Sequence, residues 1–147
     1  MSGDDDDLSD LLEETRILLP GAELLAAFLT TLPFTDRFSH ITDAERVVYV
    51  IAFLSDITAL ASFLTPAAYH RVAQPIRDKA AFKIFANRFI VFGLVPFSLA
   101  LSLVSYLVTS IVVSPVFGAI TGGVVASMLV VLWWIVPYSR AHNRASK

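Results

Sequence analysis

Two acidic residues, Glu23 and Asp56, lie inside long apolar stretches of the chain. Asp56 is the tenth residue of a 20-residue apolar run from Val47 to Pro66, and Glu23 lies roughly two helical turns into an earlier run. Aspartate at the centre of a membrane span costs about 2.5–3.5 kcal/mol, so such acids often mark a route for protons or ions. The pair therefore predicts an intramembrane polar site that binds protons or cations.

Asp56 has no basic partner within any apolar stretch. It must therefore either accept hydrogen bonds from hydroxyls or carry a proton. Ser98, Ser102 and Ser105 form a stripe of small hydroxyls at helical spacing, and we include them in the candidate polar site. The alternative role is structural: a single neutral acid that holds helices together through hydrogen bonds.

The composition indicates a membrane protein rather than a soluble domain. Apolar residues make up 56% of the chain and charged residues 16%, and the mean hydropathy is +0.69. No charged residue occurs between Arg88 and Arg140, a stretch too long for a soluble core and sufficient for two membrane spans. The chain has no cysteine, which excludes disulfides and thiolate catalysis.

Four apolar stretches predict an all-α membrane protein with four transmembrane helices in an antiparallel bundle. Each has roughly the 17–25 residues that a helix needs to cross a bilayer. Lipid offers the backbone no partners and the alternation of a barrel strand is absent, so helices are expected. The spans cover about 17–35, 47–66, 89–113 and 116–138, within a membrane domain of residues 17–138.

The segments outside the spans carry most of the charge. Residues 1–16 combine an acidic tail with a short amphipathic lead-in, and residues 139–147 form a basic tail. The loop 67–88 has the character of a basic amphipathic helix that Pro75 would open, or of a plain solvated loop. Its cations are candidate contacts for anionic lipid head groups: Arg71, Arg77, Lys79, Lys83 and Arg88.

The charge distribution predicts the topology. All eleven lysines and arginines except Arg37 and Arg46 fall on the side that holds both termini and the loop 67–88. The positive-inside rule then predicts cytoplasmic N- and C-termini.

Gly118, Gly122 and Ala126 recur every four residues in the last span. Such a face of small residues lets helix backbones approach closely and predicts helix packing. Packing inside the bundle is one interpretation, and a homodimer seam or a face for a membrane-protein partner is the other.

Residue patterns of catalysis and cofactor binding are missing. His40, His70 and His142 are far apart in loops or the tail, without the spacing of metal ligands, and no nucleotide-binding glycine motif occurs. We therefore expect no enzymatic activity, no cofactor, no metal and no nucleic-acid partner.

Several short strings together resemble one family: ETRILLPGAELL, LPFTDRF, ERVVYV, PAAYHR, and DK followed by ANR. They are similar to an uncharacterised family of small bacterial integral membrane proteins, a domain of unknown function, over about residues 8–113. The resemblance implies four spans and supplies no catalytic residues.

These observations favour a non-enzymatic accessory or structural protein that packs against another membrane protein or organises anionic lipid. The alternative is a small proton- or cation-coupled transporter that uses Glu23 and Asp56.

Overall fold

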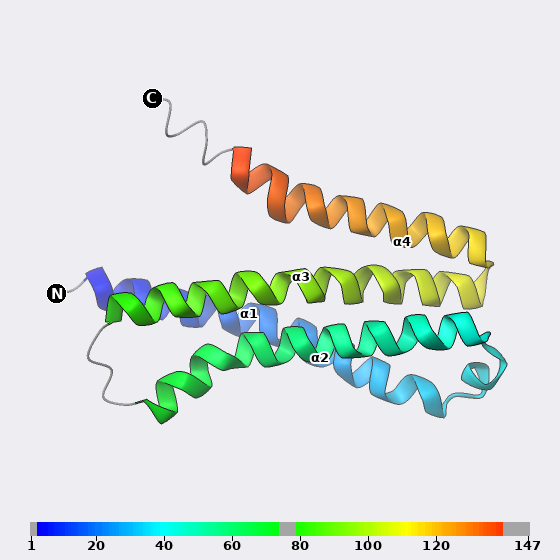
Figure 1. The fold of residues 1–147 in the computed structure, drawn as a ribbon, viewed down its shortest axis with the longest axis horizontal. Coiled ribbons are helices and arrows are strands. Elements are labelled where there is room, and N and C mark those ends of the chain that lie inside the picture. The colour runs from blue at the N-terminus through cyan, green and yellow to red at the C-terminus, as the bar shows by residue number, and fades with distance from the viewer. Residues whose placement is uncertain (1–2, 74–78, 140–147) are drawn as a thin grey trace. The chain divides into compact units, whose positions relative to one another are not determined.

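A computed structural model describes residues 3–73 and 79–139 of the chain. Its regular structure over these residues consists of helices, four of which are long (Figure 1). They are α1 (Gly3–Thr31), α2 (Asp43–Val72), α3 (Lys79–Val112) and α4 (Pro115–Val130). A π-helical segment, η3 (Val131–Ile135), follows α4 directly.

All four long helices are long and apolar enough to cross a membrane. The candidate spans are Ile17–Phe34, Asp43–Val72, Ala80–Val112 and Pro115–Ser139, with mean hydropathies of 1.7, 2.0, 2.1 and 2.2. A hydrocarbon core of about 30 Å needs about 20 helical residues, so even the shortest of these comes close to the required length. The predicted all-α class with four membrane-spanning helices is confirmed.

The helices extend beyond the predicted spans at several ends. α1 begins at Gly3, within the predicted acidic tail. α2 reaches Val72 with His70 and Arg71 in its last turn, and α3 begins ten residues before the predicted Phe89. Pro75, Arg77 and the basic tail from Arg140 lie outside the described residues.

The connections between helices are short. Two 3-10 helices, η1 (Leu32–Phe34) and η2 (Asp36–His40), join α1 to α2. At the start of α4 the Ser114 hydroxyl accepts a 3.4 Å hydrogen bond from the backbone N–H of Phe117, and Pro115 occupies the first turn. Proline is well suited to that position because the first N–H groups of a helix have no partner within it.

The chain divides into two compact units, Met1–Ser39 with Phe53–Phe97, and His40–Ala52 with Ser98–Lys147. In the first unit, the rings of Phe63 and Phe97 meet edge to face with their centroids 5.9 Å apart. A Cβ atom on Gly93 would lie only 2.6 Å from a ring carbon of Phe63, so glycine is what permits this approach. Further along α2, Tyr69 stacks on Phe82, which comes earlier in α3 than Phe97. The two ring pairs together show that α2 and α3 run antiparallel in this unit.

In the second unit, α4 packs against α3 through its glycines. A Cβ on Gly118 would lie 2.8 Å from the Tyr106 carbonyl oxygen, and one on Gly122 would lie 3.1 Å from the Ser102 carbonyl oxygen. Gly118 and Gly122 are buried, whereas Ala126 is half-buried. This part of the small-residue face is therefore used for packing between two helices of the same unit.

Candidate functional site

The side chain of Asp56 is enclosed within the protein. It has 0% exposure, and neither carboxylate oxygen has a hydrogen-bond partner among the described residues. Helical spacing places it on the same face of α2 as the fully buried Ala59 and Phe63. Because buried polar groups are normally hydrogen-bonded, an acid without partners is a candidate site for a proton or another ligand.

Two of the serines expected near Asp56 donate their hydroxyl hydrogen bonds to backbone carbonyls of their own helix. Ser102 donates a 2.7 Å hydrogen bond to the carbonyl of Ser98, and Ser105 donates a 2.8 Å bond to the carbonyl of Leu101. Ser102 is buried, whereas Ser98 and Ser105 are half-buried. The hydroxyls of Ser102 and Ser105 are thus engaged elsewhere, and Asp56 accepts no hydrogen bond within the described part of the chain.

Glu23, the second acid of the predicted site, lies in a different environment. The buried face of α1 carries Ala22 and Leu29, each with 0% exposure, while Glu23 is exposed. Its neighbour Leu24 is also exposed. The structure therefore does not place Glu23 and Asp56 in one enclosed pocket.

Glu45 is a buried acid that lies two residues before the predicted second span. It is 8% exposed and forms a capping box at the start of α2. One carboxylate oxygen accepts bonds of 2.9 Å from the backbone N–H and from the hydroxyl of Thr42, while the backbone N–H of Glu45 donates to the Thr42 hydroxyl at 3.3 Å. The other oxygen accepts a 2.6 Å hydrogen bond from the Ser110 hydroxyl. The string TDAE before an apolar run is the sequence signal for this cap, although it does not reveal Ser110.

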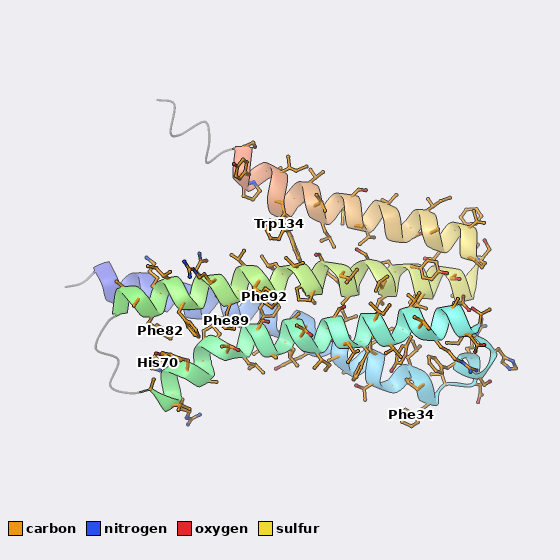
Figure 2. The ribbon with its side chains drawn as sticks, in the orientation of Figure 1. Phe34, His70, Phe82, Phe89, Phe92 and Trp134 are labelled. Atoms are coloured by element: carbon orange, nitrogen blue, oxygen red, sulfur yellow. The ribbon has the colours of Figure 1, made fainter. Side chains whose placement is uncertain are left out.

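Aromatic rings gather where α2 ends and α3 begins. The ring of Tyr69 lies 5.8 Å from that of Phe82 and 4.8 Å from that of Phe85, and Phe85 lies 4.7 Å from Phe89. The ring centroids of His70 and Phe82 lie 5.8 Å apart. Figure 2 labels both side chains, His70 on α2 and Phe82 on α3. Aromatic side chains with a polar edge, such as tyrosine, are common at the membrane–water boundary.

Exposed cations lie close in sequence to these aromatic residues. Arg71 follows Tyr69 by two residues, Lys83 lies between Phe82 and Ile84, and Arg88 lies one turn after Phe85; all three cations are exposed. We call Tyr69, Arg71, Lys83, Phe85 and Arg88 the cationic end of the first unit. Of the other predicted lipid contacts, Lys79 is the first residue of α3 and Arg77 lies outside the described residues.

No group of three or more histidine, aspartate or glutamate side chains that could hold a metal ion occurs within residues 3–73 and 79–139 that the structure describes. The Glu45 carboxylate accepts hydrogen bonds from Thr42 and Ser110. Asp56 and the cationic end remain as candidate binding features of the described chain.

Searches of curated proteins and of solved structures found no match to the chain. A family model, described as a family of unknown function, DUF6328, matches residues 4–137. The match extends through all four long helices, including α4, which the resemblance noted from short strings did not reach. The chain therefore belongs to the DUF6328 family.

Proposed function

We propose that the protein is a non-enzymatic accessory protein of the bacterial cytoplasmic membrane that organises anionic lipid at its cationic end. The observation that carries this proposal is the set of exposed cations, Arg71, Lys83 and Arg88, each within three residues of one of the packed rings of Tyr69 and Phe85. Anionic head groups attract such cations, and aromatic rings anchor a helix end at the boundary.

The proposed topology agrees with this role. The cationic end lies on the side that the positive-inside rule assigns to the cytoplasm, together with both chain termini. The cytoplasmic leaflet carries the anionic lipids, and each lysine or arginine near it contributes about 1 kcal/mol of attraction. The cations and the lipids that they would bind are then on the same side of the bilayer.

The test is lipid binding by the full chain in nanodiscs that contain a fixed fraction of anionic lipid. The double variant Arg71→Gln/Arg88→Gln should lose affinity for anionic lipid by about fivefold per residue, measured by native mass spectrometry. The control, Arg37→Gln/Arg46→Gln, removes the same charge from the connection between α1 and α2 and the start of α2. Equal lipid retention by both double variants would contradict the proposal.

A membrane-protein partner or a second copy of the chain is the other contact that an accessory protein could make. Gly118 and Gly122 already pack against α3 within the second unit. A partner would therefore use outward faces, such as the one on α1 that carries Glu23 and Leu24. The same mass spectra report stoichiometry and any co-purified protein.

Proton- or cation-coupled transport is the second candidate function, and the observation that favours it is the enclosed carboxyl of Asp56. In proteoliposomes with an imposed pH gradient, wild type should then carry a proton flux that Asp56→Asn abolishes. Glu23→Gln tests whether the exposed acid contributes. Absence of flux from wild type would reject transport and leave the lipid-binding proposal intact.

A further inference from the structure

We infer that Asp56 is a proton-binding site within the membrane. Its carboxyl carries a proton at neutral pH while the helices are packed as in the structure. This proton exchanges with water when the contact between Phe63 and Gly93 loosens. The inference goes beyond lipid binding and does not require net transport, because a site can hold and exchange a proton without moving it across the bilayer.

The first step rests on the absence of any compensating partner. Asp56 has 0% exposure, and neither oxygen accepts a hydrogen bond from a described residue. A carboxylate enclosed without donors or a counter-charge is far less stable than the neutral acid. A proton removes that charge by forming one O–H bond, whereas a metal cation would need several oxygen ligands.

The other titratable groups of the first unit leave Asp56 without a counter-charge. Those that the structure describes are exposed or half-buried, namely Glu23, Asp36, Arg37, Tyr69, His70, Arg71, Lys83 and Arg88. None of them forms a hydrogen bond with the Asp56 carboxylate. Among the described side chains of α1, the buried ones, Ala22 and Leu29, are apolar.

The second step rests on the packing two turns further along α2. Phe63 lies seven residues after Asp56 on the same helix face, about 10 Å along the axis, and has 0% exposure. Its ring contacts Phe97 edge to face at 5.9 Å, and it lies so close to Gly93 that a Cβ there would be 2.6 Å from a ring carbon. Along this face of α2, the Phe63 ring thus lies between Asp56 and the cationic end.

Infrared spectroscopy of the full chain in lipid tests protonation. At pH 7 wild type should show the C=O stretching band of a protonated carboxyl, which ionised carboxylates lack. The band should vanish in Asp56→Asn and persist in Glu23→Gln and Glu45→Gln. A spectrum without this band, or a band that survives in Asp56→Asn, would overturn the inference.

A second measurement covers the case in which Asp56→Asn does not fold. Wild type labelled with ¹³C at the aspartate side-chain carboxyl should show, by solid-state NMR at pH 7, one protonated signal among otherwise ionised aspartates. If every aspartate signal is ionised, the inference fails.

Hydrogen–deuterium exchange of the protonated carboxyl tests the packing step, since transfer to D₂O shifts its C=O band. Gly93→Ala forces the Phe63 ring to move, and Phe63→Leu shortens it without adding atoms at Gly93. Either variant should exchange roughly tenfold faster than wild type, as expected for easier local opening. Gly123→Ala is the matched control because nothing lies within 4 Å of its added Cβ. Unchanged exchange in both test variants would reject the role of this contact.

These outcomes separate the proton site from the functions proposed above. A protonated Asp56 in a protein without proton flux supports the inference and rejects transport. Absence of the protonated-carboxyl band from wild type, with lipid retention still dependent on Arg71 and Arg88, rejects the inference and leaves lipid binding standing.

Discussion

The hydroxyl of Ser110 donates a 2.6 Å hydrogen bond to the carboxylate of Glu45, 65 residues earlier in the chain. The same carboxylate closes the capping box with Thr42 at the start of α2. Ser110 is also the residue whose Cβ would lie 2.9 Å from a Cβ added to Gly118. Three helices of the second unit therefore meet at Ser110, and one polar contact ties α2 to the place where α4 packs on α3.

Removal of the Ser110 hydroxyl should destabilise the protein through this contact. We expect Ser110→Ala to lower the free energy of unfolding by about 0.6 kcal/mol and by no more than about 1.7 kcal/mol, the mean and the maximum for hydrogen bonds between membrane helices. Ser105→Ala is the control, because the Ser105 hydroxyl donates only to the carbonyl of Leu101 on its own helix. Denaturant unfolding in mild detergent measures both, and equal stabilities would show that the bond to Glu45 contributes nothing.

An added methyl group at Gly118 should disrupt the packing of α4 on α3. Its Cβ would lie 2.8 Å from a backbone oxygen of Tyr106, which cannot move without shifting α3. We expect Gly118→Ala to destabilise by about 1–3 kcal/mol. Gly123→Ala, whose Cβ meets no atom within 4 Å, should be neutral or slightly stabilising because alanine favours helix. Thermal unfolding measures both variants. Equal unfolding temperatures for Gly118→Ala and Gly123→Ala would refute the packing role of Gly118.

Replacement of Asp56 by a small apolar residue should stabilise the protein. Asp56→Ala removes a buried polar group without partners, a group that typically costs about 1–3 kcal/mol, although the smaller volume offsets part of the gain. The exposed Asp36, changed to alanine, provides the comparison. Lower stability of Asp56→Ala than of wild type, measured by denaturant unfolding, would mean that the carboxyl has a stabilising partner after all.

Single-cysteine labelling of intact cells checks the proposed topology, since the natural chain has no cysteine. Ser39→Cys, in the connection between α1 and α2, should react with a membrane-impermeant maleimide from outside. Asn143→Cys, in the basic tail, should react only after the membrane is permeabilised. The reverse pattern would invert the topology and put the cationic end outside the cell.

The amino-acid sequence by itself determined the fold class and the approximate spans. Apolar content is a local sum along the chain, so the uncharged stretch from Phe89 to Ser139 requires membrane helices whatever their neighbours are. The four-residue spacing of Gly118 and Gly122 likewise indicated a packing face on α4, because small residues that recur on one helix face permit close backbone contact.

Only the tertiary structure decided which polar groups meet. The bond between Glu45 and Ser110 depends on two helix faces that come together from distant parts of the chain. Helical spacing places Asp56 on one face of α2. The burial of its side chain, however, depends on the residues packed around it. Glu23 and Asp56 are both acids in apolar runs, yet one is exposed and the other enclosed. Burial is a property of the assembled helices, so no local pattern could distinguish the two.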